Sequence, residues 1–392
     1  MSALYGLLMR WNFAFPAKFL SYQNLLQSHS HVAFLGWGYI VVIGAIMYYF
    51  VSDFKKQNNV YKITLVILLV AITLMLISFP LGGYKVFSIV LLAVFGLTSY
   101  VLSFRILKDL QGNNTSAKLI RYGIYYYLLS SLATWFLAYV IVNQGKSALY
   151  YNTVYFYLHF LYNGFFVFAL FGLLFKIFEN QQIVISEKLK QHFFIYLNIA
   201  CIPAYALSVL WSTDVLLFNF VGFVASVLQF ISLVFLIKIM RHAFLQINWH
   251  FISKLLLKFA LFSYSLKIIS QILSSFPYFV EKSLALKPFF IIGYLHLFTL
   301  GFLSVLLFLI MDQLGKLNLH KPTSKVGIIL FLAGVFITEL LLFLQGFLFL
   351  FQFDAIKNYP LILLIFSFLM MVGLLVIYVN QFHHDWIIKK TL

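Results

Sequence analysis

The sequence predicts an all-α, polytopic transmembrane helix bundle of 11–12 spans, and three observations lead to this fold class. Hydrophobic residues make up 63% of the chain, with a mean hydropathy of +0.99. Charged residues make up only 9%, against about 25% in soluble domains. The apolar residues also gather into runs of about 20, the length that crosses a bilayer. Only helices satisfy the backbone of such runs in lipid.

Eleven runs have the length and composition of a membrane-spanning helix. They cover residues 25–51, 63–80, 86–104, 122–142, 152–175, 191–211, 215–237, 259–277, 288–311, 326–350 and 360–381. Residues 4–20 form a weaker segment, which is either a twelfth span or an interfacial helix. Short connections join the runs, and no soluble domain or internal repeat is visible. We therefore predict that residues 1–392 form a single integral membrane domain.

The positive charge of the chain predicts its orientation. The 27 Lys and Arg residues against 10 Asp and Glu residues give a net charge of +17. Nineteen of these cations fall on the connections of one side, and five fall on the other side. The five are Lys85, Lys146, Lys282, Lys287 and Lys357. By the positive-inside rule, the sequence predicts a multi-pass protein of the inner membrane with a cytoplasmic C-terminus.

The composition also excludes several classes of protein. A soluble enzyme could not hide so much apolar surface, and a nucleic-acid binder concentrates its charge on a soluble basic face. Cys201 is the single cysteine, which excludes an internal disulfide framework, a zinc ribbon and a cysteine-ligated cluster. The partner that the composition requires is the lipid bilayer.

Ionisable residues inside the runs are few, and such residues indicate function because they are costly in lipid. His31, His159 and His296 lie 6, 7 and 8 residues from the outer starts of three runs. At 1.5 Å per residue, all three lie roughly 9–12 Å below the outer boundary. They could therefore face one another and share a cofactor or metal. Alternatively, each is a separate buried histidine bonded to its neighbours.

The residue types at this depth favour haem over zinc. A haem takes axial imidazoles from two helices, whereas a zinc site usually adds carboxylates or thiolates, which are absent here. His29 and His31 point about 200° apart on a helix, so they cannot both face the plane of the same haem. His31 begins the apolar stretch, so we choose His31 as the ligand and place His29 nearer the interface. Gly36 and Gly38 would let a helix or a flat macrocycle approach closely.

The order of the histidines resembles subunit I of the haem–copper oxidases and the related NnrS-like membrane proteins. With residues 4–20 counted as helix one, the three histidines fall in helices two, six and ten. Residues 28–37, Ser-His-Ser-His-Val-Ala-Phe-Leu-Gly-Trp, look like the His-x-His helix of the NnrS-like proteins. Residues 296–301, followed by Leu314 and Gly315, resemble their later His-x-x-Thr-x-Gly run, which contains Thr299. The resemblance implies a haem–copper-oxidase-like helix arrangement.

The same resemblance implies roles for the histidines. Helices two and ten of that family hold the low-spin haem, so His31 or His29 would hold a haem b together with His296. Helix six supplies a copper ligand, so His159 would pair with His296, bind a metal such as copper alone, or contact a substrate. The family's adjacent histidine pair is absent from residues 191–211, which contain Asn198, Cys201 and Tyr205 instead. The complete centre that reduces dioxygen is therefore not evident. Any catalysis would be that of an oxidoreductase, and whether the protein turns over a substrate stays open.

Further polar residues form two predicted groups. Tyr162 and Asn163 lie three and four residues after His159, either as a hydrogen-bonded redox group or as interhelical polar packing. On the helix of Lys267, Gln271 belongs to a polar stripe that must face the bundle interior. Glu339 lies near mid-membrane like Lys267, so the two form either a structural ion pair or a proton path.

These observations leave three hypotheses for function. The first is a haem-binding protein in electron transfer, in handling of nitric oxide or another diatomic gas, or in haem and copper homeostasis. Its partners would be a cytochrome or quinol electron donor, or other oxidase subunits. The second is a proton-coupled transporter or channel that uses Lys267 and Glu339. The third is a membrane assembly factor without chemistry of its own.

Overall fold

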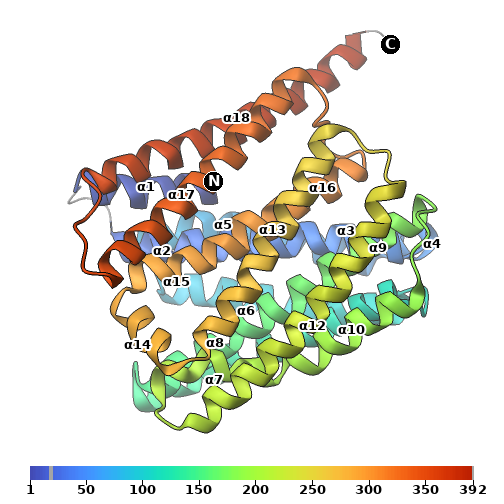
Figure 1. The fold of residues 1–392 in the computed structure, drawn as a ribbon. Helices are drawn as coiled ribbons and strands as arrows, with labels where there is room; N and C mark the ends of the chain where they lie inside the picture. Colours follow the sequence, from blue (N-terminus) through green and yellow to red (C-terminus); the bar gives the residue numbers. More distant parts are fainter. Residues whose placement is uncertain (17–20, 391–392) are drawn as a thin grey trace.

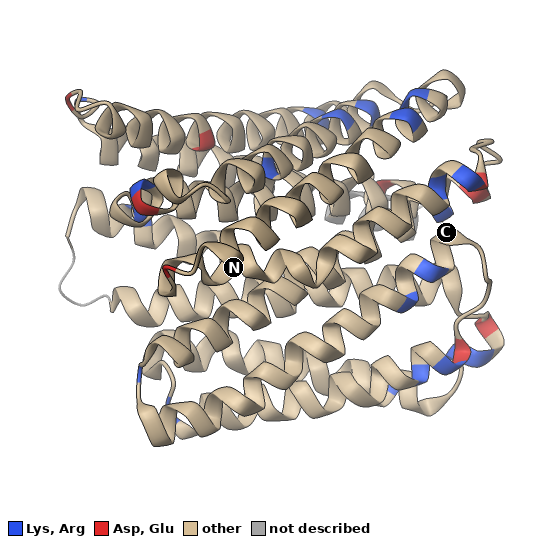
Figure 2. Cartoon of the chain, turned by 60° about the horizontal axis from the view of Figure 1, so that its bottom comes forward, with Lys and Arg blue, Asp and Glu red and all other residues tan. Residues whose placement is uncertain are grey.

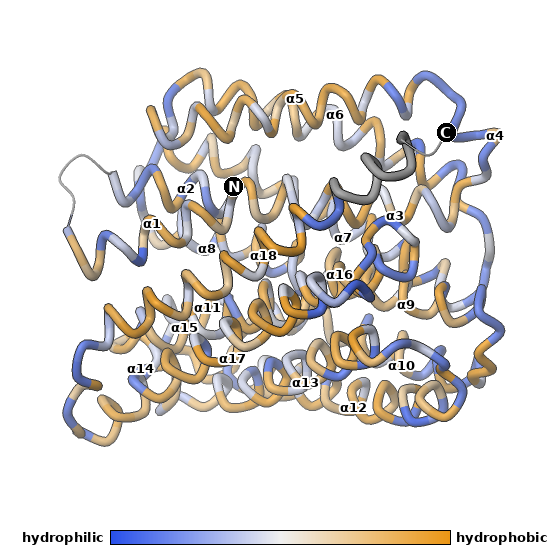
Figure 3. Tube along the Cα trace, turned by 90° about the horizontal axis from the view of Figure 1, so that it is seen from above, coloured by the Kyte–Doolittle hydropathy of each residue, from blue (hydrophilic) through white to orange (hydrophobic). Residues whose placement is uncertain are grey.

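The computed structural model describes residues 1–16 and 21–390, with side chains up to residue 381, and every element in these ranges is a helix. The long helices run side by side along one common direction in a bundle (Figure 1). Their middle parts are hydrophobic and the hydrophilic residues gather toward the ends (Figure 3). This is an all-α polytopic membrane protein, as the sequence predicts.

Ten helices and one bent pair are long and apolar enough to cross a membrane among the described residues. They are α2–η1–α3 (Tyr22–Phe50), α5 (Asn59–Gly82), α6 (Val86–Asp109), α7 (Thr115–Gln144), α8–η2–α9 (Ala148–Asn180), the bent pair α10 (Glu187–Cys201) with η3–α11–η4 (Pro203–Ser212), α12 (Leu216–Gln246), α13 (Phe251–Ser274), α15–η5–α16 (Lys287–Gln313), α17 (Pro322–Leu350) and α18 (Tyr359–Lys390). Each coincides with one of the eleven predicted runs. Two shorter helices, α4 (Asp53–Lys56) and α14 (Pro277–Ala285), lie in the connections.

Helix α1 (Ser2–Ala14) corresponds to the weaker segment at residues 4–20. It packs against α2 and α18, and thus belongs to the bundle. Its 13 residues measure about 20 Å, which is less than the roughly 30 Å of a hydrocarbon core. Residues 17–20, with Lys18, lie outside the described residues, so the prediction of a twelfth span stays open.

A proline bends the predicted span at residues 191–211. Pro203 has no backbone N–H and clashes with the preceding turn, which interrupts a helix. Helix α10 accordingly ends at Cys201, and the following short helices leave at an angle of 47°. The amide of Tyr205 bonds to the carbonyl of Ile202 at 3.1 Å. Because an α-helix would have paired this amide with the Cys201 carbonyl, the bend frees that carbonyl for another partner.

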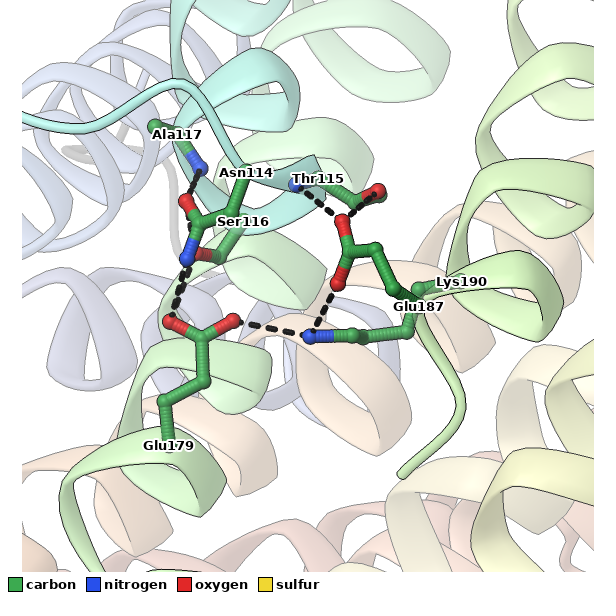
Figure 4. A network of polar contacts seen from close by, with 7 residues as sticks. All are labelled: Asn114, Thr115, Ser116, Ala117, Glu179, Glu187 and Lys190. Carbon is green, nitrogen blue, oxygen red and sulfur yellow. Dashed lines mark hydrogen bonds and ion pairs between the residues drawn. The ribbon is translucent and has the colours of Figure 1, made fainter. Parts of the chain in front are cut away.

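The cations gather at one end of the bundle, where Figure 2 shows most of the Lys and Arg residues. A polar network at this end joins three helices (Figure 4). Lys190 lies 2.9 Å from Glu179 and 2.7 Å from Glu187. The Thr115 backbone N–H donates to Glu187 at 2.7 Å, and Asn114 donates to Glu179 at 2.8 Å. The network thereby fixes the start of α7 against the end of α9 and the start of α10.

The orientation predicted from the cations can be tested by cysteine labelling. In a Cys201→Ala background, we expect Lys146→Cys to react with a membrane-impermeant maleimide in intact cells. We expect Lys118→Cys to react only after permeabilisation, because one span separates the two positions. Both side chains are exposed, so access to label is limited by the membrane alone. Equal labelling of both positions in intact cells would contradict the predicted topology.

Candidate functional site

The three predicted histidines occupy the same structural position on three helices. His31, His159 and His296 are each the residue immediately before a π-helical segment. These segments are η1 (Val32–Tyr39), η2 (Phe160–Phe166) and η5 (Leu297–Ser304). π-Helical segments are rare and occur frequently at functional sites. Their coincidence with all three histidines marks this level of the bundle as the candidate site.

The three π-helical segments pack directly against one another. Tyr162 of η2 lies between Phe34 of η1 and Phe298 of η5, with ring centroids 5.0 and 5.2 Å away. The indole N–H of Trp37 in η1 donates to the Ser304 hydroxyl of η5 at 3.0 Å. These contacts join residues two to eight positions beyond each histidine. The histidines therefore lie at a similar level of the bundle, just outside a shared aromatic layer.

His29 and His31 face different neighbours. The Nδ1 of His31 donates to the Gln27 carbonyl at 2.8 Å, which leaves Nε2 with the lone pair. This Nε2 lies 3.2 Å from the hydroxyl of Tyr84, and the ring stacks on Phe79 of α5. The Nδ1 of His29 instead donates to the Ser2 carbonyl of α1 at 2.9 Å. The opposite faces predicted for the two histidines are thus observed.

A group of four ionisable residues, here called the Glu339 cluster, comes from α1, α2, α15 and α17. It consists of Arg10, His29, His296 and Glu339. His296 interacts electrostatically with His29 and Arg10, and Arg10 does so with Glu339. The Nδ1 of His296 lies 3.8 Å from Oε1 of Glu339, which is too long for a hydrogen bond. The sequence pairs His296 with His31, whereas in the structure His296 interacts electrostatically with His29.

The Glu339 cluster is incompletely paired. Glu339 is 6% exposed, and neither of its carboxylate oxygens has a hydrogen-bond partner. A buried carboxylate without partners is strongly destabilising, so such groups are retained where they have a role. The side chain of His296 remains 27% exposed although its helix lies inside the bundle. The imidazole is therefore only partly covered by neighbouring side chains.

His159 has a complete set of partners. Its Nε2 donates to the Cys201 carbonyl at 2.8 Å, which is the carbonyl freed by the bend at Pro203. Its Nδ1 lies 3.2 Å from the amide nitrogen of Asn163, which donates to it. Only 3% of the residue is exposed. His159 thus supplies the hydrogen bond that the Cys201 carbonyl lacks at the end of α10. Neither ring nitrogen of His159 is free for a metal.

Lys267 belongs to a second group, here called the Lys267 cluster, together with His159, Asn163 and Cys201. Lys267 is 2% exposed, and its ammonium lies 5.5 Å from the centre of the Tyr264 ring. It interacts electrostatically with His159 and Cys201. Among the described residues no carboxylate lies within ion-pair distance of Lys267. The two predicted partners therefore form no ion pair: Lys267 interacts electrostatically with His159, and Glu339 lies 3.8 Å from His296.

The remaining predicted residues fall into different surroundings. Asn163 contacts His159 as expected, but Tyr162 turns into the aromatic layer, because a π-helical segment with i→i+5 bonds shifts the residues that share a face. Thr299 donates its hydroxyl to the Leu295 carbonyl at 2.8 Å and remains within its own helix. Gln271 is 5% exposed, and its side-chain oxygen is buried without a partner. The polar stripe of α13 thus faces the bundle interior, as predicted.

The donor set can be compared with the needs of the two expected cofactors. Metal-ligating histidines usually donate one ring N–H to a carbonyl or carboxylate and bind through the other nitrogen. His29 and His31 donate Nδ1–H to carbonyls, and His296 has Glu339 on its Nδ1 side. These hydrogen bonds to Nδ1 are of the kind that ligating histidines make. In the described part of the chain, no group of three or more His, Cys, Asp or Glu could hold a metal ion.

Sequence reasoning missed Arg10 as a member of the site. Arg10 interrupts the apolar residues of the first segment, and this single cation within an otherwise apolar helix was the available signal. The π-helical segments were also missed, because hydrophobic periodicity does not distinguish them in an apolar run. Each contains a glycine with a neighbouring helix close by. A Cβ on Gly38 would meet Phe166 at 2.7 Å, and one on Gly164 would meet Tyr126 at 2.5 Å.

Comparison with known proteins found no match for this chain. No protein-family model matches the chain, and no curated protein matches it significantly.

The role of His159 in the bend of α10 predicts a stability effect. His159→Leu leaves the Cys201 carbonyl and the Asn163 amide without partners, and a buried unsatisfied polar group costs about 1–3 kcal/mol. We expect a clear fall in the melting temperature of the purified protein in detergent. The matched control is His242→Leu, because His242 is exposed on the cation-rich end. An equal melting temperature for the two variants would contradict this role.

Proposed function

We propose that this protein is an integral membrane haem protein of the electron-transfer class. One haem b would be held by His296 of α15 and by a histidine of α2. The observation that carries the proposal is that His31 and His296 each immediately precede a π-helical segment, and that these two segments pack together. A haem supplies one-electron chemistry and a binding site for diatomic gases. Handling of nitric oxide or another diatomic gas would therefore suit this class.

The residues around the histidines support this proposal in different ways. The Gln27 carbonyl holds the ring of His31, and the Ser2 carbonyl holds that of His29. Glu339 lies on the Nδ1 side of His296, where a carboxylate raises the basicity of a ligating imidazole. His159 is left out of the ligand set because both of its nitrogens are bonded. The proposal therefore includes haem and does not include copper at His159.

The haem ligand from α2 is either His29 or His31, which gives the proposal two forms. His29 interacts electrostatically with His296 and needs no rearrangement of its partners. His31 would have to exchange the Tyr84 hydroxyl for iron, and Tyr84 is 50% exposed and so could turn away. The two forms differ in which single substitution removes the low-spin spectrum. An electron donor such as a cytochrome or quinol, or other oxidase subunits, would be the partners.

A second candidate function is a proton-coupled transport path. The observation that favours it is the presence of two buried ionisable groups, Lys267 and Glu339, that form no ion pair with each other. Each lies beside one of the histidines, and Gln271 adds an unpartnered oxygen on the helix of Lys267. Groups of this kind mark proton relays within membranes. Such a path could also operate alongside a haem.

The haem proposal predicts a defined set of spectra. Purified protein supplied with haem should show Soret and alpha bands after reduction with dithionite. We expect His296→Ala to abolish the low-spin signal, and either His29→Ala or His31→Ala to abolish it as well. His159→Leu and the exposed His242→Ala should retain it. Circular dichroism confirms that each variant is folded.

The contradicting result of this experiment is clear. A protein that is folded and supplied with haem but shows no Soret band would exclude the proposal. Bands that survive in His296→Ala would exclude the assigned ligand.

The transport candidate predicts that flux depends on both buried ionisable groups. In proteoliposomes with a pH-sensitive dye, Lys267→Met and Glu339→Gln should each lower proton flux at least ten-fold, because each removes a protonatable group. Lys118→Gln is the control, since Lys118 is exposed at the start of α7. Flux that continues unchanged in both variants would argue against the path.

A further inference from the structure

A hollow lies between α12 and α13, away from the histidines. Its volume is about 210 Å³. Six apolar side chains and two polar ones line it. The lining residues are Leu233, Leu236, Ile237, Met240, Arg241, Phe244, Leu261 and Ser265. The site is thus an almost wholly apolar groove with one charged residue.

The spacing of the lining residues gives the groove a direction. The α12 residues recur at intervals of three and four, so they form one stripe along the helix. Leu233 lies eight residues before Arg241, which corresponds to about 12 Å along the axis of α12. Ser265 is the smallest lining side chain, and its hydroxyl donates to the Leu261 carbonyl at 2.8 Å. The groove therefore runs from Arg241 into the hydrocarbon core. Beyond Arg241, its lining has no unpaired polar group that a ligand would have to satisfy.

The mouth of the groove is positively charged. Arg241 is exposed, and among the described residues it has no ion pair or hydrogen bond. Lys258 of α13 lies over the ring of Phe244, with its ammonium 5.9 Å from the ring centre. Lys238 lies over Phe235, one turn deeper on α12. Neither α12 nor α13 contains an Asp or Glu residue, so no acidic residue on these two helices neutralises the mouth.

We propose that this groove binds one anionic phospholipid, with its phosphate at Arg241 and Lys258 and an acyl chain along α12 as far as Leu233. The charge of the mouth selects an anionic headgroup over a zwitterionic one. The apolar stripe selects a lipid over free phosphate, because burial of methylene groups supplies affinity that a phosphate lacks. Basic pockets between transmembrane helices bind anionic headgroups in this way. The site is independent of the histidines and of any haem.

The experiment is a lipid titration of the full-length protein in detergent, followed by native mass spectrometry. The probes are dioleoyl-phosphatidylglycerol and dioleoyl-phosphatidylcholine, with inorganic phosphate as competitor. We expect the anionic lipid to bind more tightly, and Arg241→Gln to weaken it about five-fold, the effect of one basic residue near a headgroup. Lys118→Gln, which removes an exposed cation from the same end of the bundle, should change nothing. Inorganic phosphate should not displace the lipid.

A second variant tests the apolar part of the groove. Ser265→Leu fills the hollow without changing any charge, so it should weaken binding of both lipids. Helicity and melting temperature confirm that each variant is folded. Equal affinity for the two lipids, or equal effects of Arg241→Gln and Lys118→Gln, would overturn the proposal. Unchanged binding in Ser265→Leu, or displacement by inorganic phosphate, would overturn the acyl-chain site.

Discussion

The hydrocarbon core offers no water to an unpaired backbone group, and the rest of this structure depends on that constraint. Long helices satisfy it by themselves, which is why every span is helical. Where the hydrogen-bond ladder is interrupted, a side chain must complete it. The bend at Pro203 frees the Cys201 carbonyl, and His159 of a neighbouring span donates to it. A histidine that resembles a ligand in the sequence thereby has a structural partner on each ring nitrogen.

The same constraint explains why the π-helical segments are informative. Each keeps its backbone bonded within the helix, but the wider turn moves the following side chains around the axis. At three matching places this turn directs aromatic residues into one layer, in which Tyr162 contacts both Phe34 and Phe298. The histidines lie at the edge of that layer. An irregularity repeated on three helices at one level is better explained by a shared requirement than by three separate accidents of packing.

Much of the fold was predictable, but only part of the candidate site was. The eleven spans follow from the length and hydropathy of each run, and the break at Pro203 follows from one residue. The polar face of α13 followed from helical spacing, because Lys267 and Gln271 lie four residues apart on a regular helix. Tyr162 departed from its expected face because η2 is not a regular helix. The position of Arg10 beside Glu339 depends on how α1 packs, which no local pattern encodes.

The sequence by itself determined that this chain is a membrane bundle. An apolar run long enough to cross the bilayer forms a helix whatever its neighbours are, because the helix satisfies its own backbone hydrogen bonds. It also determined that few ionisable residues lie in the spans, since each can be read directly from its run. Only the tertiary structure decided which of these residues meet. It left Lys267 and Glu339 without an ion pair to each other, and it gave His296 an electrostatic interaction with His29 while His31 stacks on Phe79 of α5. The physical reason is that the rotation of each helix is set by side-chain packing across the whole bundle, and a turn of 100° per residue exchanges one neighbour for another.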